Sequence, residues 1–186
     1  MNKMCLAVIT MAFALLAFHA AAVDNPDAAF YKKAAEGGIA EVELGKLAQE
    51  KSSTQSVKDF GAMMVTDHSA ANDKLKAIAD RKEIKLPTSP SVGQMATKTK
   101  LEVLSGGTFD ESYIKGMVKD HEGDIKEFQK EATAGQDPDA KAYATATLPT
   151  LKAHLKKIQS IASAQSIAWT TDGRGDKGGI APRVTQ

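Results

Sequence analysis

Four long segments carry apolar residues at the three- and four-residue spacing of an amphipathic helix, and this pattern constrains the fold more than any other feature of the chain. Aromatic residues make up only 5% of the sequence and alanine is abundant, which suits closely packed helices better than a β-sandwich. The sequence therefore predicts an all-α fold without strands of consequence. The predicted helices cover residues 26–51, 54–82, 109–134 and 138–164.

Capping residues precede three of these segments. Asn25-Pro26 and Asp137-Pro138 each place a capping side chain before a proline, a residue that is favoured in the first helical turn. Thr108 and Glu111 have the spacing of a capping box, so we expect them to open the third long helix.

The connections predict how the helices are joined. Short polar turns link the first helix to the second and the third to the fourth, whereas a longer segment with Pro87 and Pro90, and a short helix predicted at residues 92–104, separates the pairs. Two hairpins joined by one long crossover is the connectivity of a ferritin-like four-helix bundle. We expect one such domain over residues 23–164, followed by a disordered tail over residues 165–186.

The N-terminal segment predicts export. Lys3 precedes an apolar run over residues 4–18, and Ala20-Ala21-Ala22 follows, as in a signal peptide cleaved after Ala22. The run is too short for a membrane-spanning helix, which needs roughly 20 residues. We therefore predict a periplasmic protein without membrane insertion after cleavage. Cleavage would remove Cys5, the single cysteine of the chain, so the mature protein cannot form disulfides.

The charges of the predicted mature chain are balanced. Without Lys3 the chain has 23 basic and 23 acidic residues, and the two signs are interspersed. This distribution does not indicate a nucleic acid or an anionic membrane as a partner.

Three histidines remain after the predicted cleavage, and all of them fall on apolar helix faces. His68, His121 and His154 lie within the apolar stripes of the second, third and fourth long helices when residues are placed at about 100° per position. Glu41 lies among small residues on the inner face of the first helix, where an unpaired carboxylate would be costly. All four residues lie near the middle of their helices, so a bundle would bring them to a similar depth.

One carboxylate and three imidazoles form a donor set that suits zinc, copper, iron or manganese. We therefore predict a site for a single transition metal ion with Glu41, His68, His121 and His154 as ligands. Asp67 and Asp120, which directly precede histidines, could orient them, although adjacent residues on a helix point about 100° apart. Asp124, on the inner side of its helix, is the better candidate and is added as a further ligand or as an orienting residue. The alternative is a metal-free hydrogen-bonded network in the core.

Several motifs resemble a known family in combination. The chain is similar over about residues 27–162 to the bacterial family called domain of unknown function 4142. The motifs include Ala34-Ala35-Glu36-Gly37-Gly38, Met64-Val65-Thr66-Asp67-His68, Met117-Val118-Lys119-Asp120-His121 and Leu148-Pro149-Thr150-Leu151-Lys152-Ala153-His154-Leu155. The resemblance implies an exported protein with a ferritin-like bundle and no established activity, and the motif histidines of the family match His68, His121 and His154.

Enzymatic motifs are not evident in the sequence. Di-iron members of the ferritin-like superfamily place a glutamate three residues before a ligand histidine, but Val65, Val118 and Leu151 occupy those positions here. This departure favours one ion with mainly imidazole ligands. The sequence favours a protein that is not an enzyme. The two readings are a metal-binding bundle and an envelope structural or stress-related interaction protein with a metal-free polar core.

Overall fold

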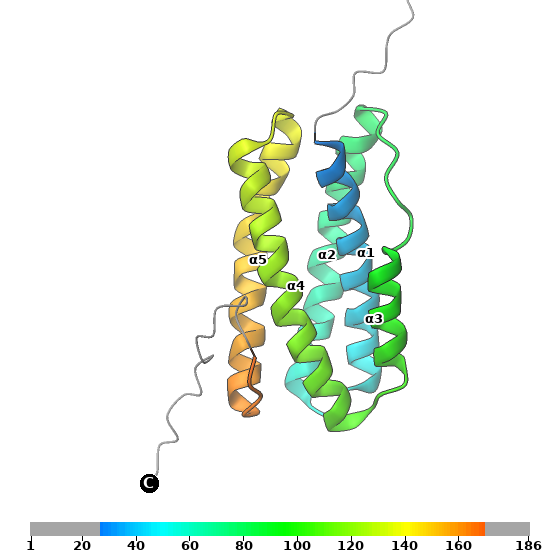
Figure 1. The fold of residues 1–186 in the computed structure, drawn as a ribbon, viewed down its shortest axis with the longest axis vertical. Coiled ribbons are helices and arrows are strands. Elements are labelled where there is room, and N and C mark those ends of the chain that lie inside the picture. The colour runs from blue at the N-terminus through cyan, green and yellow to red at the C-terminus, as the bar shows by residue number, and fades with distance from the viewer. Residues whose placement is uncertain (1–26, 170–186) are drawn as a thin grey trace, which may run out of the picture.

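The computed structural model describes residues 27–169 of the chain, and these residues contain five helices and no strand (Figure 1). The predicted all-helical fold is therefore confirmed for these residues. The helices agree with the predicted segments to within three residues at each end. They are α1 (Ala28–Lys51), α2 (Gln55–Arg81), α3 (Val92–Glu102), α4 (Gly106–Ala134) and α5 (Pro138–Ala164).

The four long helices form two antiparallel hairpins, α1–α2 and α4–α5, which lie side by side (Figure 1). At one end, the Asp27 carboxylate accepts hydrogen bonds from backbone N–H groups of the α4–α5 turn. At the other end, Ser53 of the α1–α2 turn donates to Asp110 near the start of α4, with a distance of 2.6 Å between the two oxygens. The starts of α2 and α4 therefore lie at the same end, and these two helices run in the same direction.

The segment between the hairpins must return along the length of the molecule, because α2 ends at the opposite end from the start of α4 (Figure 1). Its last part forms α3, which packs against α1 and α4. A capping box opens α3: the Ser91 side chain accepts from the backbone N–H of Gln94, and the Gln94 side chain accepts from the backbone N–H of Ser91. The predicted short helix at 92–104 is thus present and ends two residues early.

The capping box predicted at Thr108 and Glu111 is wrong. The helix begins at Gly106, so Thr108 already lies inside its first turn, and Glu111 pairs with Lys115 instead, at 2.6 Å. Gly106 has a φ of +59°, which glycine adopts at little cost, and this lets the chain enter the helix earlier than the capping pattern indicated. The cap at Asp137 is confirmed, because its side chain accepts from the N–H of Asp139. Asn25-Pro26 lies outside the described residues.

Two apolar clusters fill the interior between the hairpins. The Phe60 cluster lies toward the α1–α2 turn and includes Met64, whereas the Phe128 cluster lies toward the α4–α5 turn and includes Leu75. His68 lies between Met64 and Leu75 on α2, and the other three helices show the same order. A layer of four polar residues therefore separates the two apolar clusters; we call it the histidine layer, and it consists of Glu41, His68, His121 and His154.

Helices α1 and α2 approach each other closely at two glycines. A Cβ atom built on Gly45 would lie 2.6 Å from the carbonyl oxygen of Gly61, and a Cβ on Gly61 would lie equally close to the carbonyl of Gly45. Real Cβ atoms do not come so near to a backbone oxygen, so larger residues would push the helices apart. Glu41 lies one turn from Gly45, and this crossing therefore brings it close to α2.

Residues 165–169 differ from the sequence expectation, because they belong to the packed part of the chain and not to a disordered tail. The Gln165 side chain donates to the Thr54 hydroxyl, and Ile167 and Trp169 pack against the Phe60 cluster. Their apolar side chains were overlooked because they show no helical periodicity. The rest of the predicted tail and the predicted signal peptide lie outside the described residues. Among residues 27–169, no helix is both long and apolar enough to cross a membrane.

Candidate metal site

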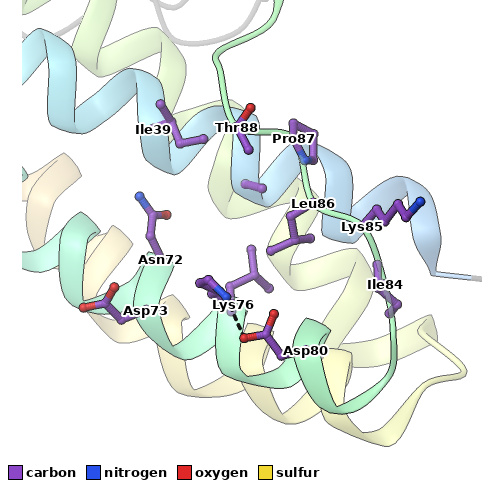
Figure 2. A pocket seen from close by; sticks show the side chains of 12 residues that line it. Ile39, Asn72, Asp73, Lys76, Asp80, Ile84, Lys85, Leu86, Pro87 and Thr88 are labelled. Carbon is purple, nitrogen blue, oxygen red and sulfur yellow. Dashed lines mark hydrogen bonds and ion pairs between the residues drawn. The ribbon is translucent and has the colours of Figure 1, made fainter.

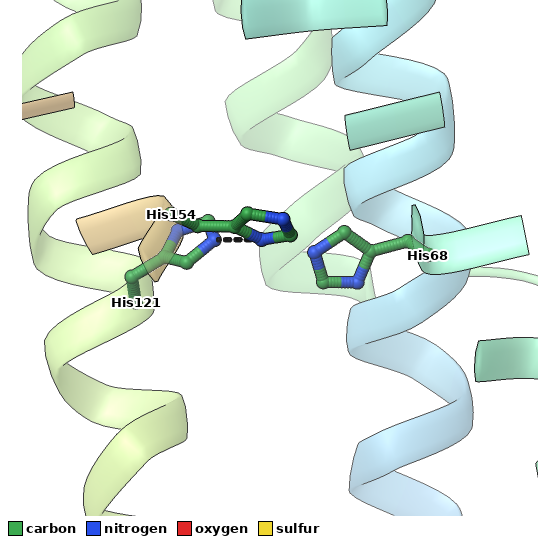
Figure 3. A group of neighbouring side chains, drawn as sticks. All are labelled: His68, His121 and His154. Atoms are coloured by element: carbon green, nitrogen blue, oxygen red, sulfur yellow. Dashed lines mark hydrogen bonds between the residues drawn. The ribbon is translucent and has the colours of Figure 1, made fainter. Parts of the chain in front are cut away.

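Three imidazole rings from α2, α4 and α5 point toward one another in the middle of the molecule (Figure 3). One nitrogen of each ring, in His68, His121 and His154, lies within 4.8 Å of a nitrogen of the other two. The rings are shielded from solvent, since these residues are 7%, 0% and 1% exposed. Each helix presents its histidine inward because the residue falls within the apolar stripe that the sequence showed.

Glu41 on α1 completes the histidine layer. Its Oε2 atom lies 3.0 Å from Nε2 of His68 and 3.5 Å from Nε2 of His121. Glu41 Oε2 and His68 Nε2 are buried and form an ion pair with each other, but the geometry of this contact is not that of a good hydrogen bond. Buried polar atoms are usually well satisfied, so a bound cation could improve the contacts of both atoms.

The hydrogen bonds around His121 and His154 fix which ring nitrogens carry protons. Nδ1 of His121 lies 2.9 Å from the carbonyl oxygen of Met117 and must donate to it, because a carbonyl can only accept. Nε2 of His154 lies 2.7 Å from an oxygen of Asp67 and donates to that carboxylate. The remaining nitrogens, His121 Nε2 and His154 Nδ1, face each other at 3.4 Å (dashed line in Figure 3). When both rings are neutral these two atoms present only lone pairs.

These distances fit a metal ion. Two ligand atoms bound at about 2.1 Å in tetrahedral geometry lie about 3.4 Å apart. Two contacts in the layer have this length: His121 and His154 are 3.4 Å apart, and His121 and Glu41 are 3.5 Å apart. The contact between His68 and Glu41 is shorter, at 3.0 Å. A cation between the two nitrogens would also provide the positive charge that two facing lone pairs need in order to lie so close together. The alternative is one extra proton on the pair of rings.

The electrostatics of the layer favour a negative Glu41. Burial on its own would raise the pKa of Glu41, but the charges of His121 and His68 outweigh it and lower the pKa to about 2. Burial likewise acts to lower the pKa of His68, and the Glu41 carboxylate more than reverses this, so the pKa is raised. The pKa of His154 is lowered by burial and by the neighbouring histidines, against the opposing effect of Asp67. His154 is therefore disposed to be neutral, as a metal ligand must be.

Asp67 on α2 orients His154 on α5. The sequence indicated Asp67 as a residue that could orient a histidine, but not which one, because this partner lies on the other hairpin and helical periodicity does not show contacts between hairpins. A carboxylate that accepts the outer N–H of a histidine is the usual support for a metal-binding imidazole.

Asp124, predicted as a ligand or an orienting residue, lies outside the histidine layer. It lines a cavity together with His68, yet within residues 27–169 no hydrogen bond or ion pair joins it to a layer residue. Burial, and after it the charges of Glu41 and Asp120, raise the pKa of Asp124 to about 8. The structure thus brings together four of the five predicted residues and leaves Asp124 beside them.

The fold and the site define a class: an all-helical protein whose two hairpins enclose a buried layer of three histidines and one carboxylate. The chain belongs to the family described as domain of unknown function DUF4142, whose family model matches residues 14–161. This confirms the family that the sequence motifs resembled. A search of curated proteins found no match.

The structure is similar to that of a protein from Streptomyces coelicolor, described as a secreted DUF305 protein. The TM-score is 0.66 and the sequence identity is 13%, and the match covers 78% of this chain and 97% of that chain. At this identity the similarity concerns the fold alone.

Proposed function

We propose that this protein is an exported, ferritin-like four-helix-bundle protein that binds one transition metal ion through Glu41, His68, His121 and His154. The observation that carries the proposal is the pair of facing lone pairs on His121 Nε2 and His154 Nδ1. The two buried atoms beside them, Glu41 Oε2 and His68 Nε2, whose contact lacks the geometry of a good hydrogen bond, support the same conclusion. Asp67 would hold His154 in the tautomer with the proton on Nε2, which leaves Nδ1 to bind the metal.

Connectivity supports the ferritin-like assignment. The helices α2 and α4 run in the same direction and are joined by a crossover along the length of the molecule, as in bundles of that class. The signal-peptide pattern of residues 1–22 supports export to the periplasm, and the Streptomyces protein of similar fold is described as secreted.

The donor set indicates which metals to test first. Imidazole ligands suit zinc, copper and iron, whereas manganese prefers sites with more oxygen ligands. A single carboxylate, without the Glu-x-x-His pairs of di-iron proteins, favours one ion over a bridged pair. Zinc and copper are therefore the leading candidates, followed by iron and manganese. The proposal assigns a role in holding the ion and no catalytic step.

The test uses the chain from residue 23 onward, purified without a histidine tag. The protein is dialysed against each candidate ion, and the bound metal is measured by elemental mass spectrometry. We expect close to one ion per chain in the wild type and none in His68→Ala or His121→Ala. Retention of metal by both variants would contradict the ligand assignment. A wild type that retains no ion would favour the metal-free polar core of an envelope interaction protein.

A further inference from the structure

A cavity of about 220 Å³ opens beside His68. Its walls come from all four long helices, and His68, Gly38, Asn72, Asp124 and Glu127 are among the residues that line it. A larger cavity of about 530 Å³ lies between α1, α2 and the segment 84–88 (Figure 2), but no residue of the histidine layer lines it. The smaller cavity therefore gives a path between the layer and solvent, and the larger one does not.

Exposure falls along this path from the surface to the layer. The side chains of Lys33 and Glu127, which form an ion pair at 2.9 Å, are 60% and 33% exposed. The His68 side chain is 9% exposed. Lys33 and Glu127 thus lie nearest the mouth of the cavity and His68 lies at its base.

The side chains along the path suit a cation once Asp124 is ionised, at a pH above its raised pKa of about 8. Two carboxylates, Asp124 and Glu127, line the cavity with one amine, Lys33, and that amine is paired with Glu127. Asp124 has no such partner among residues 27–169 and shares the cavity with His68. Carboxylates in a cleft raise the local concentration of cations and speed their association.

We propose that this cavity is the port through which the metal ion enters and leaves the histidine layer, with Asp124 as a transient ligand on the way. This inference rests on the proposed function. It explains why Asp124 lies beside the four predicted ligands and not among them. It also makes His68, the layer residue that lines the cavity, the first one that an entering ion meets.

A glycine in the cavity wall makes the port testable. Gly123 lines the cavity, and a Cβ atom built on it would meet no atom within 4 Å. Gly123 is exposed, so a larger side chain at this position would stand at the mouth of the cavity and narrow it without displacing a ligand. Gly116 on the same helix is the matched control, because a Cβ there also meets nothing and it lines a different cavity.

The first experiment measures how fast metal-free protein takes up Zn²⁺ or Co²⁺ in a stopped-flow instrument, and how fast it releases the ion to a chelator. We expect Gly123→Leu to slow both uptake and release at least about tenfold, with the equilibrium affinity unchanged. We expect Gly116→Leu to match the wild type. Equal rates in Gly123→Leu and the wild type would overturn the port.

The second experiment removes the carboxyl group of Asp124 and is run at about pH 9, above the raised pKa of this group, so that it is ionised in the wild type. Asp124→Asn should slow uptake about tenfold, the lower end of the electrostatic range, while the affinity stays within a factor of about three. Glu122→Gln, a charge change nearby on α4 outside the cavity, should leave the rate unchanged. Loss of equilibrium binding in Asp124→Asn would make Asp124 a resident ligand and overturn its transient role. A wild type that binds no metal would overturn the site as well as the port, whereas normal binding with unchanged rates overturns the port alone.

Discussion

Two of the polar groups within residues 27–169, one at an end of the molecule and one at its centre, are satisfied to different degrees. The end cluster, Asp27, Tyr31, Lys82 and Asp137, joins the start of α1, the end of α2 and the α4–α5 turn. The Tyr31 hydroxyl donates to Asp137 at 3.0 Å, Lys82 pairs with Asp137 at 2.8 Å, and Asp27 accepts from backbone N–H groups. In the histidine layer, in contrast, the facing nitrogens of neutral His121 and His154 have no proton between them, and the Glu41–His68 ion pair at 3.0 Å lacks the geometry of a good hydrogen bond.

The difference separates a structural role from a binding role. In the end cluster each of the four side chains has a partner within the protein, so its contacts fasten the two hairpins, although the neighbouring Glu131, which bonds to Asp27, keeps one oxygen without a hydrogen-bond partner. The histidine layer is equally buried but is completed only when a cation or an extra proton is added. Leaving such atoms unsatisfied costs stability, and sites that do so are usually functional.

The largest expected effect is on metal binding. His154→Ala removes one ligand and the Asp67-supported ring, so we expect the affinity for Zn²⁺ to fall more than about a hundredfold, beyond the loss typical of an outer-shell residue. The measurement is a competition titration against a chelator of known affinity. An affinity within tenfold of the wild type would exclude His154 as a ligand.

The metal should also stabilise the fold in a pH-dependent manner. At a free metal concentration a hundred times the dissociation constant we expect about 2.7 kcal/mol, or roughly 5 to 10 °C in Tm for a chain of this size. Because folding raises the pKa of His68 above 6.5, the metal-free protein loses stability as pH rises through that raised pKa. Metal binding requires loss of the same proton, so the increase in Tm should be larger at pH 7.5 than at pH 5.5. Calorimetry with and without Zn²⁺ tests this, and a metal effect that is greater at the lower pH would contradict it.

A smaller effect is expected from the residue that supports His154. Asp67→Ala should weaken metal binding between about 10-fold and 100-fold, because the imidazole loses the acceptor that fixes its tautomer. Asp73→Ala, which removes an exposed carboxylate from the same helix, is the matched control and should bind like the wild type. If the two variants bind equally well, the contact between Asp67 and His154 has no part in the site.

The smallest effect concerns the end cluster. Tyr31→Phe removes one hydrogen bond to Asp137, which keeps its contact with Lys82, so we expect a loss of about 1 kcal/mol in the free energy of unfolding. Urea denaturation measures this loss, and metal affinity should not change. A weaker metal affinity in Tyr31→Phe would show that the two polar regions are coupled.

Much of this arrangement could be predicted from local sequence patterns. Helical spacing placed the helices to within three residues and put Glu41, His68, His121 and His154 on inner faces, because burial follows the 3.6-residue period. Contacts between hairpins could not be predicted in this way. The pairing of Asp67 with His154 and that of Asp27 with the α4–α5 turn depend on how one hairpin is shifted along the other.

Local patterns also failed where two of them competed. Thr108 and Glu111 have capping-box spacing, but Gly106 allows the helix to begin earlier, and the box forms at Ser91 and Gln94 instead. Asp124 points inward, as its position on the helix indicated, and yet its depth places it in the cavity beside His68. Helical periodicity predicts the direction in which a side chain points, but not how far its end lies from the other residues of a site.

The central claim is that the histidine layer is a ligand site and not a packing network. The most direct test is an anomalous-difference map from crystals of the protein grown with Zn²⁺. We expect one peak within about 2.3 Å of His121 Nε2, His154 Nδ1 and His68 Nε2, with Glu41 as the fourth ligand. A map without a peak at the layer, with His121 and His154 still in contact through a shared proton, would contradict it.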